Sequence, residues 1–319
     1  MRTTHDEQEL RMRVRQMRWE ADRVVSLDLE RIDGGDLPAW TPGAHVDLHL
    51  PGVITRQYSL TGAPADRRTW RIAVLHEESG RGGSRAVHTQ VRAGDELTVV
   101  GPRNNFPLDP ASDYLFVAGG IGITPLVPML AAAEAAGASW RLVYGGRTRS
   151  AMAFASALAA AHPKRVDVVP QDERGLLDLP SLLGNLAPET QVYCCGPEPL
   201  LAAVEALCLA DRLHVERFAA RPRSETEPGA ERAFEVVLQQ SGDVVPVAPG
   251  QSVLEALEAR GLDVPNSCRE GICGTCETKV IDGIPDHRDS LLSDEERAAN
   301  DTMMVCVGRA LSDRLVLDL

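Results

Sequence analysis

The sequence predicts a multidomain protein of the α/β and β classes: an antiparallel β-barrel, then a parallel α/β sheet, then a smaller β-rich part. Three observations predict this order: short alternating strands in the first third, apolar strands alternating with helices in the middle, and a polar, proline-containing stretch before the last part. The 319 residues leave room for two or three compact domains. The predicted domains are 1–110, 111–223 and 233–319, with a linker at 224–232.

The first domain consists of many short strands separated by glycine and proline. The stretches RMRVRQM, VVSLDLE and HVDLHL alternate apolar and polar residues, and WRIAVLHE and ELTVVGP follow. Strict alternation places one face of each strand in a core. Many short strands with turn signals between them are typical of an antiparallel barrel.

The middle domain alternates apolar strands with helices. YLFVAGG, WRLVYGG, RVDVVPQ and QVYCCGP each precede a helical stretch, which predicts a parallel sheet with crossover helices. The first turn, GGIGITP at 119–125, would let a pyrophosphate approach the backbone at a helix N-terminus. By itself the turn is a weak signal, because Pro125 replaces the third glycine of G-x-G-x-x-G.

The last domain begins with a predicted hairpin, FEVVLQQSGDVVPVAPG, and a short helix, SVLEALEARG. Ser252 is the expected N-cap of that helix, and Gly261 is the expected stop. The stretch NSCREGICGTCETKV then follows, and 29 residues separate its last cysteine from a fourth one. The cysteines are Cys268, Cys273, Cys276 and Cys306, in the spacing of a plant-type 2Fe-2S cluster.

Disulfide bonds and a zinc site are the two alternatives to a cluster for these cysteines. Disulfides are disfavoured because seven cysteines are an odd number and the charged N-terminus lacks the apolar region of a signal peptide. Four thiolates also suit zinc, but zinc sites usually pair two C-x2-C knuckles and only one such pair occurs here. Gly271 and Gly274 fit a tight loop around a cluster, with backbone N–H groups directed at its sulfurs.

The charge of the chain is uneven. The formal net charge is −13, and residues 233–319 hold 16 acids against 7 bases. Such acidity disfavours nucleic-acid binding, and near a redox centre it would either steer a basic partner or only confer solubility. No apolar run is long enough to cross a bilayer, so no membrane partner is expected. Reduced cysteines favour the cytoplasm, and the absence of a heptad seam favours a monomer.

Taken in chain order, these and further motifs resemble the phthalate dioxygenase reductase family, within the larger group of ferredoxin-NADP reductase-like proteins. The resemblance covers nearly the whole chain. It implies a flavin-binding barrel, an NAD(P)-binding α/β domain and a C-terminal β-grasp ferredoxin domain. Its motifs are Arg56-Gln57-Tyr58-Ser59, Gly82-Gly83-Ser84, the stretch 119–125, Cys195-Gly196-Pro197, Glu216-Arg217-Phe218 and the four cysteines.

The resemblance implies roles for these residues. FMN is expected in place of FAD, because the barrel-first domain order resembles the family's FMN members. Arg56 and the turn at 82–84 would hold the FMN phosphate, and Tyr58 would stack on its ring. Thr124 and Phe218 would close the flavin pocket from the nucleotide side. The residues expected around the reacting centre are Cys195 (packing near the nicotinamide), Thr124 and Ser59.

The expected cofactor-binding residues combine the flavin motif, a ring-edge strand, the glycine turns and the strand ends. They are Arg56, Gln57, Tyr58, Ser59, Ala73, Val74, Leu75, Arg81, Gly82, Gly83, Ser84, Gly119, Gly120, Gly122, Thr124, Pro125, Arg147, Cys195, Gly196, Pro197 and Phe218. The expected cluster ligands are Cys268, Cys273, Cys276 and Cys306.

The residues alone leave the coenzyme open. A dinucleotide fold often ends its second strand with an acid that binds the ribose 2′-hydroxyl, whereas LVYGGRTRS offers Arg147 and Arg149, which could accept a 2′-phosphate. The resemblance favours NADH, with NADPH as the alternative.

The resemblance implies a reductase that passes electrons from NADH through FMN and the 2Fe-2S cluster to a terminal oxygenase or demethylase. A Rieske-type oxygenase is the favoured partner. A flavin suits this task because it can take two electrons and release them singly. Two alternatives stay open: a reductase for a cytochrome P450, and a non-enzymatic 2Fe-2S redox sensor. The sensor is disfavoured because it has no use for a flavin and nicotinamide apparatus.

Overall fold

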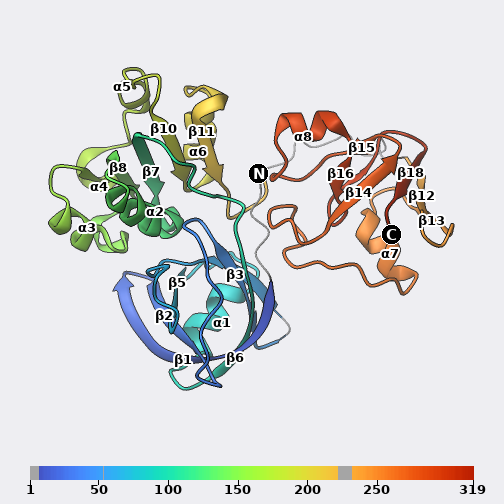
Figure 1. Cartoon of the computed structure of the whole chain (residues 1–319), viewed down its shortest axis with the longest axis horizontal. Helices are drawn as coiled ribbons and strands as arrows, with labels where there is room; N and C mark the ends of the chain where they lie inside the picture. Colours follow the sequence, from blue (N-terminus) through green and yellow to red (C-terminus); the bar gives the residue numbers. More distant parts are fainter. Residues whose placement is uncertain (1–6, 53, 222–231) are drawn as a thin grey trace. The chain divides into compact units, whose positions relative to one another are not determined.

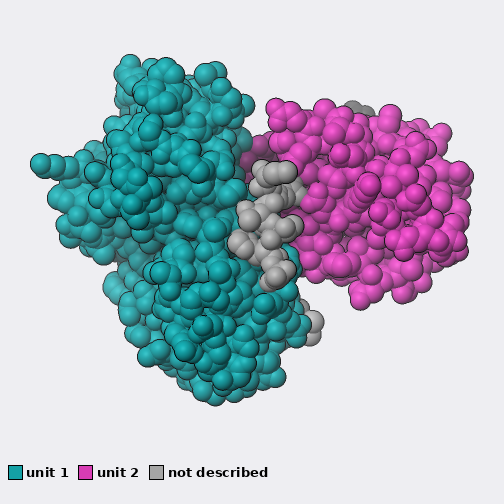
Figure 2. Space-filling view, in the orientation of Figure 1, with its two compact units in different colours: residues 1–216 teal, residues 217–319 magenta. Residues whose placement is uncertain are grey.

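The computed structural model (Figure 1) divides into two compact units, residues 1–216 and 217–319, which Figure 2 colours separately. The predicted linker, 224–232, lies outside the described residues except for Arg232. No helix in the described part of the chain is long and apolar enough to span a membrane. The residues described are 7–52, 54–221 and 232–319.

Six antiparallel strands at the start of the first unit curl into a barrel (Figure 1), with the order β4-β3-β6-β1-β2-β5. The two end strands meet at a bridge between Leu60 and Ile72, beside a hydrogen bond from Thr61 N–H to the Arg71 carbonyl at 2.8 Å. The predicted antiparallel barrel is therefore confirmed. The strands are β1 (Gln8–Ala21), β2 (Val24–Arg31), β3 (His45–Leu50), β4 (Ile54–Ser59), β5 (Trp70–Leu75) and β6 (Glu96–Arg103).

The alternation in these strands fills the barrel core. Leu10, Met12 and Val14 on β1 are buried, while the residues between them are exposed. The barrel's helix, α1 (Gly83–Thr89), adds Ala86 and Val87 to the same core. Burial of such side chains stabilises the fold by roughly 1.5–3 kcal/mol for each large one.

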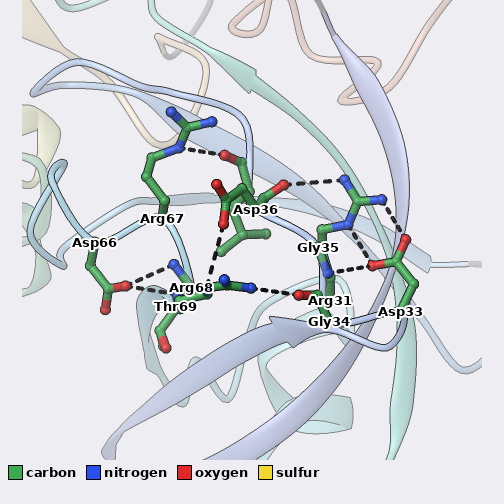
Figure 3. Close-up of polar contacts among 10 residues, drawn as sticks. Arg31, Asp33, Gly34, Gly35, Asp36, Asp66, Arg67, Arg68 and Thr69 are labelled. Atoms are coloured by element: carbon green, nitrogen blue, oxygen red, sulfur yellow. Dashed lines mark hydrogen bonds and ion pairs between the residues drawn. The ribbon is translucent and has the colours of Figure 1, made fainter.

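A polar network joins two loops at one end of the barrel (Figure 3), the β2–β3 loop and the β4–β5 loop. Arg67 Nε donates to the Leu37 carbonyl at 2.6 Å, and Arg68 donates to the Gly34 carbonyl at 2.5 Å. Asp66 accepts the backbone N–H groups of Arg68 and Thr69. Each of these hydrogen bonds joins a charged side chain to a backbone group. Because backbone groups are held, the bonds fix the paths of both loops.

The middle of the chain forms the predicted parallel sheet, with the order β11-β10-β7-β8-β9. Its strands are β7 (Asp113–Gly119), β8 (Ser139–Gly146), β9 (Val166–Pro170), β10 (Gln191–Cys195) and β11 (Leu213–Glu216). The helices between them are α2 (Ile123–Ala135), α3 (Ala155–Ala161), α4 (Gln171–Arg174), α5 (Leu179–Leu183) and α6 (Glu198–Glu205). The strand order changes direction between β7 and β10, and ligands of open α/β sheets bind at such a point.

The barrel and the parallel sheet meet in a small apolar cluster. Ala21, Val24 and Ala73 of the barrel pack with Ala153 of the sheet part. Asp22 N–H also donates to the Ser150 carbonyl at 2.8 Å. The β5 strand, which carries Ala73, therefore forms part of the wall between the two halves of the first unit.

The second unit is a five-stranded mixed sheet with the order β13-β12-β18-β14-β16, packed on α7. The helix has the predicted start, because Ser252 and Glu255 form a reciprocal capping box. Gly261, just past its end, has φ +77°, a conformation that favours glycine. The elements are β12 (Phe234–Leu238), β13 (Val244–Val247), α7 (Val253–Ala259), β14 (Glu277–Asp282), β15 (Pro285–Asp286), α8 (Asp294–Ala299), β16 (Thr302–Met304), β17 (Arg309–Ala310) and β18 (Arg314–Leu317).

Candidate functional site

The residues predicted to hold the FMN phosphate lie together at the start of α1. Arg56 on β4 donates to the Arg81 carbonyl at 2.7 Å. Gly82, the N-cap of α1, has φ +88°. A Cβ at Gly83 would lie 2.3 Å from Arg56 Cγ, so only glycine allows this close approach. Two glycines and a fixed guanidinium at one turn form a cradle that a phosphate fits.

The β4 strand supplies the rest of the flavin motif. Tyr58 is half-buried against the barrel core, and burial raises the pKa of its phenol, which stays neutral. Gln57 donates to Asp47 at 3.1 Å. The Ser59 hydroxyl is buried and has no hydrogen-bond partner among the described residues. A buried hydroxyl without a partner is costly, which fits a site where a bound flavin completes the bond.

The predicted ring-edge strand, Ala73 to Leu75, pairs with β2 along one side. The Val74 carbonyl also accepts a hydrogen bond from His88 Nε2 at 3.0 Å. His88 belongs to no motif of the sequence, and its only signal is its place four residues after the turn at 82–84, on the helix that begins there.

The two predicted nucleotide turns lie against each other, because β7 and β10 are neighbours. A Cβ at Gly122 would lie 2.3 Å from the Cys195 carbonyl oxygen, and one at Gly119 would lie 2.7 Å from Pro197 Cδ. Gly196 would be equally crowded, with the Gly119 Cα at 3.0 Å. The glycines therefore let the two strand ends pack backbone to backbone.

Thr124 lies on the first turn of α2 and is buried. Its hydroxyl donates to the Ile121 carbonyl at 2.9 Å, and the Tyr144 hydroxyl donates to the Gly120 carbonyl at 3.0 Å. Both bonds hold the glycine turn in shape. The structure thus gives Thr124 a role in fixing the turn, while its predicted contact with the flavin stays a prediction.

Cys195 ends β10 beside Glu216, the last residue of β11, with Cys195 Sγ 4.0 Å from Glu216 Oε2. Burial raises the pKa of the Cys195 thiol, so it stays protonated and is no nucleophile. Burial also raises the pKa of Glu216 to about 8. The Glu216-Arg217-Phe218 motif gives Glu216 no role by itself, because its pairing with Cys195 depends on the β10–β11 register.

Replacing Glu216 with glutamine is expected to change how stability depends on pH. The folded protein keeps the Glu216 proton up to about pH 8, whereas the unfolded chain releases it near 4.5. The native protein therefore loses stability as pH rises between these values, and Glu216→Gln does not. Melting temperatures at pH 5 and pH 8.5 measure this. If the melting temperatures of the native protein and Glu216→Gln differ by the same amount at pH 5 and at pH 8.5, the raised pKa of Glu216 is contradicted.

Arg149, one of the two arginines considered for a 2′-phosphate, is already paired. Its Nε and a terminal nitrogen donate to the two carboxylate oxygens of Glu173, at 3.0 and 2.7 Å. Such a bidentate pair fixes the guanidinium and offsets its charge. The carboxylate that pairs with Arg149 comes from α4, after β9, and not from the end of β8.

The four predicted cluster ligands are all buried, and none of them forms a disulfide. Cys273 interacts with Cys268, and Cys306 interacts with both Cys268 and Cys276, so the four sulfurs form one group. Within the described ranges, no group of three or more histidine, cysteine or carboxylate side chains is arranged so that it could hold one metal ion. A two-iron cluster needs no such arrangement, because four cysteines share its two irons.

The loop around these thiols fits a cluster. Glu270 N–H donates to Cys268 Sγ at 3.3 Å, and Cys273 Sγ lies 3.3 Å from Thr275 Oγ1. Gly271 has φ +68°, and a Cβ there would lie 2.8 Å from Asp289 Cα. The Ser267 hydroxyl is buried without a hydrogen-bond partner among the described residues. Donors near sulfur and a tight loop are the features by which proteins bind and tune such clusters.

Phe218 belongs to the second unit and is 41% exposed. Its predicted place against the flavin stays a prediction. The same holds for the exposed Arg147, whose backbone carbonyl accepts the N–H of Asp172 at 3.2 Å.

Comparison with known proteins agrees with this reading of the site. Residues 236–311 match the family model described as "2Fe-2S iron-sulfur cluster binding domain". Residues 116–206 match the model described as "Oxidoreductase NAD-binding domain". A 2Fe-2S cluster is therefore the cofactor of this part of the chain, in place of zinc or disulfides, while its binding by the four cysteines stays a prediction.

Relatives cover almost the whole chain. Phenoxybenzoate dioxygenase subunit beta of Ectopseudomonas oleovorans is 43% identical over 97% of both chains. The crystal structure of phthalate dioxygenase reductase superposes with a TM-score of 0.71 and 34% identity, over 98% of both chains. An intact type IV self-sufficient cytochrome P450 monooxygenase is 47% identical with a TM-score of 0.91. The present chain covers 41% of that P450 chain, so it spans about two fifths of its length.

The cofactors are therefore NADH, FMN and a 2Fe-2S cluster, and the chain is an oxidoreductase that delivers electrons from NADH to an oxygenase system. The residues predicted for these cofactors lie at the α1 turn, the carboxyl edge of the parallel sheet and the cysteine loop. The chain belongs to the phthalate dioxygenase reductase family.

Proposed function

We propose that the electron acceptor is a separate terminal oxygenase of the Rieske type, which hydroxylates or demethylates an aromatic acid or small amine. The observation that carries this proposal is the match over full length to a dioxygenase subunit and to phthalate dioxygenase reductase. The matching part is 41% of the P450 relative's chain, whereas it is 97% of the dioxygenase subunit.

The residues of this chain bind the FMN and the coenzyme and position their rings. Arg56 and the α1 turn hold the phosphate, and the Ser59 hydroxyl is placed to donate to the ring. The crowded glycine turns hold the two strand ends that receive the nicotinamide. When bound, FMN accepts a hydride from NADH and supplies single electrons to the cluster. The chain contributes by aligning the two rings and excluding water, and no side chain forms a covalent bond.

Electrons leave through the second unit. A pocket of about 220 Å³ reaches Cys306, so one cluster ligand borders a surface opening. The opening is also lined by Arg269, Arg288 and Arg309, within a unit that is otherwise acidic. Such a mixed surface supports a short-lived electrostatic encounter with a protein acceptor.

An anaerobic titration tests the proposal. Limiting NADH is expected to bleach the visible bands of flavin and cluster, and a purified Rieske oxygenase added next is expected to take the electrons, seen as bleaching of its own Rieske band. A bacterial P450 is the comparison. Reduction of the P450 haem without reduction of the Rieske centre would contradict the proposed partner.

The pair formed by Arg149 and Glu173 predicts how coenzyme choice can be altered. Glu173→Gln frees the Arg149 guanidinium for a 2′-phosphate. The KM for NADPH is therefore expected to fall about fivefold, because one exposed charge pair is worth up to about 1 kcal/mol. The KM for NADH is expected to change little. Steady-state kinetics with both coenzymes measure this. Glu134→Gln, which breaks the pair with Arg165 near the end of α2, is the control. An equal change in both variants would rule out a local effect.

We also propose the functional division into an FMN-binding domain at 1–110, an NAD-binding domain at 111–223 and a ferredoxin domain at 233–319. The location is proposed to be cytoplasmic, which seven cysteines without a disulfide among them support. A monomer is proposed as the working state. Size-exclusion chromatography with light scattering tests the last point, and a mass near 69 kDa, twice the 34.5 kDa of one chain, would contradict it.

A further inference from the structure

The helix α1 touches two separate parts of the FMN site. Its first turn, Gly82 to Ser84, is where the phosphate is placed, and the Ser84 hydroxyl accepts the N–H of Glu77 at 3.0 Å. Its last turn carries His88, whose Nε2 lies 3.0 Å from the Val74 carbonyl oxygen. Val74 lies on the strand that is placed at the edge of the flavin ring. One short helix therefore bridges the phosphate end and the ring end.

The geometry fixes the chemical state of His88. A carbonyl oxygen only accepts hydrogen bonds, so Nε2 must carry the hydrogen. The side chain is half-buried, and burial lowers the pKa of its imidazole, which favours the neutral form. The ring of His76 lies beside it, with centroids 5.1 Å apart. Arg23 holds His76 by two hydrogen bonds: the His76 N–H donates to the Arg23 carbonyl at 2.8 Å, and the Arg23 guanidinium donates to the His76 carbonyl at 2.7 Å.

The strand that His88 holds is shared by both halves of the first unit. Ala73, next to Val74, packs with Ala153 of the parallel-sheet part. A displacement of β5 would therefore move the flavin ring relative to the phosphate turn and relative to the nicotinamide side. The pairing of β5 with β2 and its bridge to Leu60 hold the strand in the barrel, and the His88 bond adds a directed contact that ties it to α1.

We propose that His88 is a positioning residue of the FMN site: its Nε2–H bond to the Val74 carbonyl sets the spacing between the phosphate-binding turn and the ring-binding strand. His88 acts through β5 and touches neither the phosphate nor the reacting atoms. The inference rests on the FMN site described above, and it adds a residue that no motif identified.

Two ligands separate a spacing role from a general loss of stability. FMN uses the phosphate turn and the ring strand together, whereas riboflavin lacks the phosphate and uses the ring strand alone. In flavin-free protein, His88→Asn is expected to raise the Kd for FMN about fivefold to tenfold, the range of one net hydrogen bond. The Kd for riboflavin is expected to change less than twofold. Quenching of flavin fluorescence on binding measures both constants.

Variants of matched chemistry complete the test. The longer amide of His88→Gln can bring an N–H group to Val74, so it is expected to restore most of the affinity for FMN, while the shorter His88→Asn cannot. Thr89→Val, which removes a bond within the same helix from Thr89 Oγ1 to the Arg85 carbonyl, is expected to leave the ratio of the two constants unchanged.

The proposal is overturned if His88→Asn weakens FMN and riboflavin equally, or if His88→Gln binds FMN as weakly as His88→Asn. It is also overturned if Thr89→Val shifts the ratio as much as His88→Asn, because the effect would then belong to the helix as a whole. Native protein that binds neither flavin would contradict the FMN assignment itself, a result distinct from failure of the role of His88.

Discussion

Cys273→Ser is expected to abolish electron delivery to one-electron protein acceptors while leaving the oxidation of NADH by the flavin intact. Cys273 is one of four buried thiols that form a single group, and a serine oxygen is a poorer iron ligand than a thiolate. Changes to residues that only orient metal ligands already cost about 10- to 100-fold. Loss of a ligand should therefore reduce cytochrome c reduction by more than about 100-fold.

Two assays with the same protein separate the cluster from the flavin. Ferricyanide can take electrons directly from the reduced flavin, so NADH–ferricyanide turnover should persist in Cys273→Ser when cytochrome c reduction fails. Cys208→Ser is the matched control, because Cys208 is also buried but lies in the first unit after α6. Iron content and the visible spectrum report the cluster directly. A Cys273→Ser protein with full iron content and cytochrome c activity would exclude Cys273 as a ligand.

Gly122→Ala is expected to disrupt the nucleotide site more than a glycine-to-alanine substitution at any other glycine of the two turns. The added Cβ would lie 2.3 Å from the Cys195 carbonyl oxygen and 2.6 Å from the Gly196 nitrogen. Both are backbone atoms, so relief requires moving the end of β10 or the turn before α2. Overpacking of this kind costs roughly 1–3 kcal/mol. Because each 1.36 kcal/mol is about tenfold in rate, kcat/KM for NADH should fall about 10- to 100-fold.

The glycine that follows the other end of α2 provides the control. Gly137, just after the end of α2, has φ +70° with nothing within 4 Å of the Cβ position, so Gly137→Ala introduces backbone strain away from the site. Its expected effect is a loss of stability of about 1 kcal/mol with unchanged kcat/KM for NADH. Thermal unfolding and steady-state kinetics on both variants measure these quantities. Full activity in Gly122→Ala would mean that the two turns need not touch.

Much of the fold follows from local sequence. Alternation in β1 places Leu10, Met12 and Val14 in the core, and Ser252 caps α7 as its sequence predicts. The cysteine spacing identifies the cluster site without a structure, because the ligands of such a loop lie close together along the chain. The glycines at 119 and 122 also signal a turn, although a turn alone does not specify a nucleotide.

Other features depend on residues that are distant in sequence. Glu173 neutralises Arg149 from 24 positions away, which changes the interpretation of the arginines after β8. Glu216 reaches Cys195 across 21 positions because β11 pairs with β10. Neither contact has a signature in the local pattern, since a side chain's partner is decided by strand order and register.

The sequence by itself determined the kinds of element and the glycine turns, because helix and strand periods, caps and tight turns depend on neighbouring residues, and its cysteine spacing predicted the cluster ligands. Only the tertiary structure decided which acid meets Arg149, which backbone atoms forbid a side chain at Gly122, and that His88 joins α1 to β5. These depend on how separate strands and helices are brought together, where a shift of one residue in register would replace every contact.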